Sequence, residues 1–159
     1  MPDKAAATRD REALESAKRA SALQLLFRAA RLLNERGIER VRSRGRTAAS
    51  TAHTALLPHI DLEGTRITEI ARRMRVSKQA VNQTVAELER IGLVKRTPDP
   101  SDGRARLVRF TARGRGELLA GLEILTELQR ELATEIGATR MRRLHDDLLV
   151  LVDLLEGRR

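Results

Sequence analysis

Five polar residues near the middle of the chain are spaced so that they would share one face of a helix. They are Ser77, Lys78, Gln79, Asn82 and Gln83. Glutamine and asparagine amides can recognise base edges in the major groove of DNA, and a serine hydroxyl or a lysine ammonium at a helix start can hold phosphate. The pattern therefore predicts a helix face that contacts DNA, although taken alone a polar helix face is more often only solvated.

Two arginines, Arg104 and Arg106, follow a run of turn-forming residues over 98–103. The prolines and the glycine in this run favour a turn. The short β-type runs on either side, 93–97 and 105–110, therefore predict a hairpin with a long tip. An arginine on a narrow hairpin suits the minor groove, where negative potential is concentrated. The alternative is a hairpin whose charges only protect a sheet edge.

The elements that would position these side chains have the order of a winged helix-turn-helix. Apolar periodicity predicts a helix over 67–74, a three-residue turn, and a second helix over 78–91. Ser77 is a good N-cap for the second helix because its hydroxyl can accept a hydrogen bond from a free amide of the first turn. The apolar stripe of that helix, which includes Val81 and Val85, lies opposite its polar face.

Long helices are predicted on both sides of this region. A first helix spans about 10–41, where Gly37 marks a break or a C-cap, and a shorter one spans about 47–57. Two leucine-lined helices follow Thr111 and are separated near Gly137. The predicted fold class is therefore mainly α with a small β-hairpin wing, in which N- and C-terminal dimerisation helices flank a winged helix-turn-helix lobe.

Charge is distributed unevenly over three predicted domains. Residues 1–61, the N-terminal helices, have a net charge of +5 and residues 117–159, the C-terminal helices, have −3. Residues 62–116, which we call the winged lobe, have +7. This asymmetry predicts that the winged lobe meets an anion. The leucines over 148–155 cover more than one narrow stripe, which indicates burial on two sides, either within one subunit or in a dimer interface.

The composition excludes several classes of protein. The chain of 159 residues has a net charge of +9 and no cysteine, which excludes disulfides, thiol catalysis and cysteine-bound zinc. It has no apolar run near the ~20 residues of a membrane span and no secretory signal. We therefore expect a cytoplasmic protein without membrane contact. No nucleophile spacing, phosphate loop or carboxylate pair predicts an enzyme, and no cofactor is expected.

The sequence from Arg66 to Arg96, RITEIARRMRVSKQAVNQTVAELERIGLVKR, resembles the MarR family of bacterial transcriptional regulators. The similarity continues in DPSDGR, which starts at Asp99, and in FTARG, which starts at Phe110. Its most specific part is the Asp-x-Arg of the wing tip. The resemblance is strong over about residues 62–116 and elsewhere rests on the order of the helices. Arg75 stands where a glycine is common in the family.

The family resemblance implies an obligate homodimer that binds a pseudo-palindromic operator in double-stranded DNA. It places the five polar helix residues in the major groove and Arg104 in the minor groove, with Asp102 orienting Arg104. Most members of the family repress, and many release DNA when a small molecule binds between the winged lobe and the dimer helices. On this basis the bound protein would associate with the nucleoid.

The sequence does not identify an effector or a metal. His53 and His59 are six residues apart, on different helix faces, so no metal site is expected. Without Trp or Tyr, a ligand pocket would have aliphatic walls and an Arg or His anchor, for which we considered His53.

Three functions agree with these observations. The first is a homodimeric, sequence-specific transcriptional regulator, chiefly a repressor. The second is a nonspecific architectural DNA-binding protein, which would not need the amide side chains of the helix face. The third is a winged-helix module that binds other proteins and has no salt-dependent DNA affinity. The operator, the regulated genes and the direction of control are not readable from the sequence.

Overall fold

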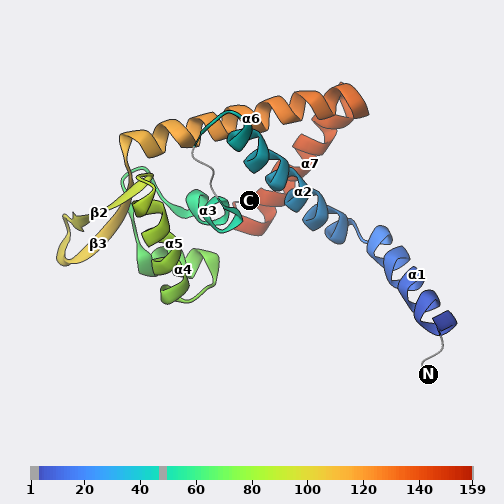
Figure 1. Cartoon of the computed structure of the whole chain (residues 1–159), viewed down its shortest axis with the longest axis horizontal. Coiled ribbons are helices and arrows are strands. Elements are labelled where there is room, and N and C mark those ends of the chain that lie inside the picture. Colours follow the sequence, from blue (N-terminus) through green and yellow to red (C-terminus); the bar gives the residue numbers. More distant parts are fainter. Residues whose placement is uncertain (1–3, 47–49, 159) are drawn as a thin grey trace.

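The computed structural model describes residues 4–46 and 50–158 and consists of helices and one small antiparallel sheet, which lies at one end of the molecule (Figure 1). The predicted fold class, mainly α with a hairpin wing, is confirmed. No helix within the described ranges is long and apolar enough to cross a bilayer. The elements in chain order are α1 (Lys4–Ala20), α2 (Ala22–Ser43), α3 (Thr51–Leu56), the 3-10 helix η1 (Leu57–His59), β1 (Thr65–Arg66), α4 (Ile67–Met74), α5 (Lys78–Arg90), β2 (Val94–Asp99), β3 (Asp102–Phe110), α6 (Ala112–Ile136) and α7 (Ala138–Glu156).

The predicted first helix, 10–41, is two helices that meet at Ser21. The Ser21 backbone is extended, and its hydroxyl accepts a hydrogen bond from the backbone N–H of Gln24, so Ser21 caps α2. Gly37 neither breaks nor ends α2, which continues to Ser43. Gly37 is buried where α2 approaches α6, and an added Cβ there would lie 3.6 Å from a methyl carbon of Leu125.

The second predicted helix, 47–57, begins at Thr51, and residues 47–49 lie outside the described residues. The α-helix α3 ends at Leu56, before Pro58, and the chain continues in a 3-10 helix. Proline is accepted in the first turn of a helix because its missing N–H would have no partner there. Accordingly, α3 is followed directly by η1, which contains Pro58.

The helix-turn-helix keeps its geometry although Arg75 replaces the usual glycine of the turn. Arg75 has φ 55° and ψ 40°, the left-handed conformation in which a side chain is strained. Its N–H donates to the carbonyl of Arg72, and the N–H of Val76 donates to Ala71, so the end of α4 is capped. Ser77 then caps α5, as predicted, by accepting from the N–H of Ala80 at 3.2 Å.

The sheet has the order β1-β3-β2, and all its pairs are antiparallel. The strands β2 and β3 extend further than predicted, because Asp99 pairs with Asp102 beyond an irregularity at Pro98. Only two residues, 100 and 101, therefore connect the strands, and the predicted long tip is wrong. The two-residue strand β1, which pairs with Val108 and Leu107, was not predicted because two residues carry no readable period.

The hydrophobic core lies in the winged lobe and includes the helix that precedes it. Leu56 of α3 packs with Val85 and Leu88 of α5 and with Val108 and Phe110 of β3. Outside this core, α6 contributes the buried side chains Ile124 and Leu128. Figure 1 shows α6 running from the winged lobe to α7 at the opposite end of the molecule, while α1 extends away from the body. The described side chains of α7 include no buried residue.

Candidate nucleic-acid interface

The helix α5 has one buried face and one exposed face. Val81, Val85 and Leu88 are almost fully buried against the core. The five predicted contact residues lie on the exposed side, on the N-terminal half of the helix and its cap. All five are exposed to solvent: Ser77, Lys78, Gln79, Asn82 and Gln83. The structure therefore presents this set together as one polar surface.

One member of this surface, Asn82, is held by a residue that the sequence analysis missed. The Arg96 guanidinium on β2 donates to Asn82 Oδ1 at 3.3 Å and to Glu89 Oε2 at 2.8 Å. The other Glu89 carboxylate oxygen accepts the backbone N–H of Arg96. Within the described residues the Asn82 amide NH2 group has no hydrogen bond, so it can donate to an outside partner.

Arg104 and Arg106 are exposed on β3, and within the described ranges neither guanidinium has a hydrogen bond or an ion pair. Asp102 Oδ1 accepts the backbone N–H of Arg104 at 3.1 Å. Asp102 therefore orders the backbone that carries Arg104 and does not contact its guanidinium. Two cations at the hairpin are thus left available to an anion.

The base of the hairpin is fixed by Asp99, which is buried although it is charged. Its Oδ1 accepts from both the hydroxyl and the backbone N–H of Ser101, at 2.7 and 2.8 Å. Its Oδ2 lies 2.6 Å from the Arg66 guanidinium at the end of β1. The hydrogen bonds from Ser101, helped by Arg66, lower the pKa of Asp99 to about 2.

Replacing Asp99 by asparagine should lower stability at neutral pH, because the amide cannot pair with the Arg66 charge. The native carboxylate stabilises the fold above its unfolded pKa of about 3.9, and this contribution is lost as the pH falls towards its folded pKa of about 2. Melting curves of the two proteins should therefore differ most above pH about 4 and converge towards pH about 2. A difference that stays constant over this range would contradict the assignment.

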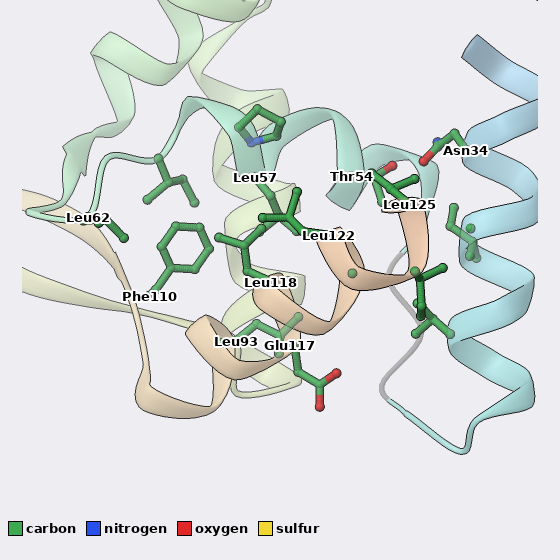
Figure 2. A pocket seen from close by; sticks show the side chains of 18 of the residues that line it. Asn34, Thr54, Leu57, Leu62, Leu93, Phe110, Glu117, Leu118, Leu122 and Leu125 are labelled. Atoms are coloured by element: carbon green, nitrogen blue, oxygen red, sulfur yellow. The ribbon is translucent and has the colours of Figure 1, made fainter. Parts of the chain in front are cut away.

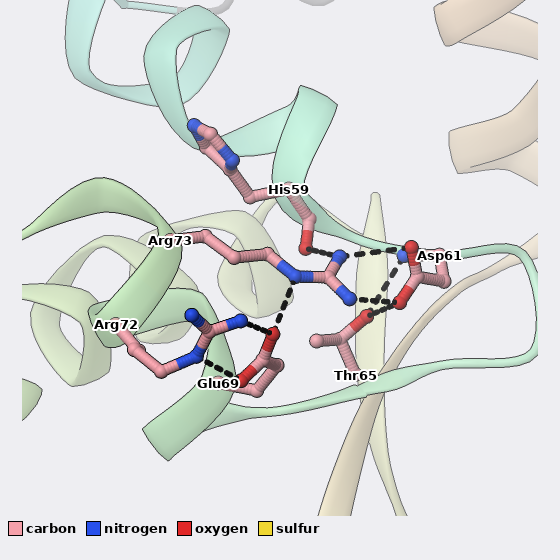
Figure 3. A network of polar contacts seen from close by, with 6 residues as sticks. All are labelled: His59, Asp61, Thr65, Glu69, Arg72 and Arg73. Atoms are coloured by element: carbon pink, nitrogen blue, oxygen red, sulfur yellow. Dashed lines mark hydrogen bonds and ion pairs between the residues drawn. The ribbon is translucent and has the colours of Figure 1, made fainter. Parts of the chain in front are cut away.

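A second network fixes α4 to the segment that follows η1 (Figure 3). Arg73 forms two hydrogen bonds of 2.9 Å to the Asp61 carboxylate and one to the carbonyl of His59. Its Nε donates to Glu69, which also accepts from Arg72. Hydrogen bonds from these two arginines lower the pKa of Glu69 to about 2. This network holds the first helix of the helix-turn-helix in place.

His53 has a structural position that differs from the one considered in the sequence analysis. It is buried and does not line the cavity described below. Its Nδ1 accepts the backbone N–H of Ser50, so Nε2 carries the proton that is donated to Glu87 at 3.0 Å. His53 thus links the start of α3 to α5. The described residues contain no group of three His, Cys, Asp or Glu side chains that could hold a metal ion.

A cavity of about 570 Å3 lies between α2, η1, the winged lobe and α6 (Figure 2). Three ion pairs hold α2 and the residues after it to α6: Arg40 with Glu131, Arg44 with Glu127, and Arg46 with Glu117. These ion pairs fix α2 and α6, which form two walls of the cavity, relative to each other. It is where the family resemblance would place an effector.

The exposed polar helix, the arginine-bearing hairpin and the terminal helices define a winged helix-turn-helix protein. Residues 50–105 match the model of the MarR family. The transcriptional activatory protein BadR of Rhodopseudomonas palustris is 33% identical over 91 residues, which cover 57% of this chain and 52% of BadR. The chain thus matches about half the length of this curated relative.

Solved structures share the fold over most of the chain. Wild-type MarR from E. coli has a TM-score of 0.68 and 18% identity, and the match covers 82% of this chain and 96% of that one. The repressor CouR bound to a 23-mer DNA duplex has a TM-score of 0.62 and 23% identity, with 84% and 93% covered. CouR from Rhodococcus jostii bound to p-coumaroyl-CoA has a TM-score of 0.60 and 24% identity, with 80% and 89% covered.

The resemblance to the MarR family noted in the sequence is confirmed by the family model over residues 50–105 and by the similarity to BadR. The MarR family is a family of transcriptional regulators, which agrees with the prediction that the chain is not an enzyme.

Proposed function

We propose that this chain is a homodimeric, sequence-specific transcriptional repressor that binds a pseudo-palindromic operator and releases it when a small molecule binds. The observation that carries the proposal is the exposed polar half of α5, opposite a buried apolar face. The same lobe carries two exposed hairpin arginines, Arg104 and Arg106, whose guanidinium groups have no partner among the described residues. Related solved structures include a complex with DNA and a complex with p-coumaroyl-CoA, which supports both halves of the proposal.

In this proposal each predicted residue has a defined partner on DNA. Ser77 and Lys78 hold phosphate at the start of α5, and Gln79 and Gln83 contact base edges. Asn82, whose oxygen is engaged by Arg96, donates through its amide to an acceptor such as N7 of a purine. Arg104 and Arg106 enter the minor groove, where the backbone at Arg104 is ordered by Asp102.

The dimer is supported by apolar side chains that the single chain leaves uncovered on its terminal helices. Phe27 on α2 is 66% exposed, Leu119 on α6 is 62% exposed, and Leu155 on α7 is 76% exposed. Exposed apolar surface of this extent marks an interaction site. We accordingly assign residues 1–61 and 117–159 to dimerisation and 62–116 to DNA binding. A two-fold dimer would place two copies of α5 about one DNA turn, roughly 34 Å, apart.

The direct test is selection of binding sites from a random DNA library, followed by titration of the selected site and of random DNA at ~0.15 M salt. We expect a two-fold-related site and a preference on the order of 10³-fold or more. Equal, steeply salt-dependent affinities would support the architectural alternative, and no binding to either DNA would support the protein-binding alternative.

The same selection with Gln83→Ala tests the reading face of α5. We expect the preference to relax at one position in each half-site, at a cost of roughly 1–3 kcal/mol for the original base. Unchanged selected sequences would show that Gln83 does not contact a base. Light scattering of the free protein gives the oligomeric state in the same preparation.

A further inference from the structure

The cavity between α2, η1, the winged lobe and α6 has the size of a site for a small organic molecule. Its volume of about 570 Å3 falls within the range of about 300–1,000 Å3 that such sites occupy. Its wall is mostly aliphatic, and the Phe110 ring lies beside Leu118 at one side of it (Figure 2). A ligand here would bury mainly apolar surface.

Basic side chains are absent from the described wall of this cavity. About one residue in five of the chain is Lys or Arg, yet among the described residues the only charged ones that line the cavity are the acids Asp61 and Glu117. A carboxylate or phosphate inside an apolar cavity needs a cation or several donors to offset its lost hydration. In this cavity the charged groups nearest to an anionic ligand would be two carboxylates, which would repel it.

The two acids are themselves already paired, and this disfavours a cationic ligand as well. Asp61 is held by Arg73 at 2.9 Å, and Glu117 by Arg46 at 3.0 Å. Figure 2 shows the Glu117 carboxylate directed away from the apolar side chains. A cation would have to displace an arginine to reach either acid, so the interior of the cavity has no net charge to offer.

Two uncharged polar side chains remain in the part of the wall that the structure describes. Asn34, on α2, is half-buried, and its amide has no hydrogen-bond partner among the residues that the structure describes. Thr54, on α3, donates its hydroxyl to the carbonyl of Thr51, so its oxygen can still accept. An unpaired, half-buried amide of this kind can both donate and accept. It can therefore bind a single hydroxyl or carbonyl group.

We propose that this cavity binds an uncharged, largely apolar molecule that carries one hydroxyl or carbonyl group, and that it discriminates against carboxylates. The proposal rests on the effector control proposed above and defines the chemical class of the effector. Asn34 recognises the polar group, and the aliphatic wall with Phe110 covers the remainder.

Calorimetric titration of the full chain with 1-decanol, decanoate and decylammonium tests this proposal without DNA. The three probes share one alkyl chain and differ only in the charge of the head group. We expect decanol to bind at least about tenfold more tightly than either ion, because an ion would lose hydration without gaining a partner. Equal or tighter binding of decanoate, or no binding of decanol, would overturn the proposal and leave the DNA-binding function untouched.

Two glycines of α6 provide a matched pair of variants that locates the binding. A Cβ at Gly121 or at Gly116 meets no heavy atom within 4 Å, but only Gly121 lines the cavity. Gly121→Leu should abolish decanol binding, and Gly116→Leu should leave it unchanged. Asn34→Lys should reverse the order of the probes in favour of decanoate. Decanol binding that survives Gly121→Leu would place the ligand elsewhere and overturn the proposal.

Discussion

Replacing Gly114 by alanine is expected to lower the free energy of unfolding by about 3 kcal/mol or more, the largest stability effect that we predict for a single methyl group. A Cβ at this position would lie 1.8 Å from the carbonyl oxygen of Leu93 and 2.7 Å from its carbonyl carbon. Both atoms belong to the backbone, so no side-chain rotation can relieve the overlap. Thermal and denaturant unfolding measure the change.

The tight packing at Gly114 has an identifiable origin. Thr111 caps α6 by accepting from the N–H of Gly114, and its hydroxyl and backbone N–H both donate to carbonyls of residues 92 and 93. These bonds draw the first turn of α6 onto the backbone that precedes β2. A side chain at residue 114 would have to occupy the space that the Leu93 carbonyl group fills.

Gly116→Ala, two residues further along the same helix, is the matched control. A Cβ there meets nothing within 4 Å, so alanine should raise stability by about 0.5–1 kcal/mol through its better helix propensity. Similar effects of the two substitutions would contradict the close approach at Leu93.

Replacing Arg104 by alanine is expected to weaken binding to the selected operator by roughly tenfold or more, because a specific arginine contact contributes about 1–3 kcal/mol and a dimer contains two. The side chain is exposed and has no partner in the described structure, so its removal should leave the melting temperature and helical content unchanged. Binding titrations and circular dichroism measure the two properties.

Arg142→Ala is the control that separates the loss of one positive charge from the loss of a specific contact. Arg142 is exposed on α7, and its removal changes the net charge by the same amount outside the winged lobe. We expect only a small loss of affinity, which salt should suppress. If Arg104→Ala stays within roughly twofold of the wild type, or matches Arg142→Ala, the hairpin does not enter the minor groove.

The parts of the fold that were predicted from the sequence are those that depend on local patterns. Apolar periodicity located α4 and α5, Ser77 and Thr111 marked helix starts, and Gly137 marked the separation of α6 from α7. The polar face of α5 was predicted for the same reason, since its residues are near neighbours in sequence. Whether those residues contact DNA stays a prediction.

The contacts that were not predicted join residues that are distant in sequence. Arg66 and Asp99 are 33 residues apart, and His53 and Glu87 are 34 apart. Each is an ordinary charged or polar residue on its own element, and only the fold brings the partners together. The division of the first helix at Ser21 was missed for another reason, because alanines and leucines continue the helical period on both sides of it.

The two glutamates near the end of α5 hold it from different sides. Glu87 is bonded to His53 on α3, and Glu89 is bonded to Arg96 on β2. Residues two apart on a helix point about 200° from one another, so the two bonds oppose each other around the helix axis. A roll of α5 in either direction would stretch one of them. The two bonds therefore resist rotation of α5 about its own axis. In the function proposed above, a signal that removes α5 from DNA would move it together with the elements that hold it.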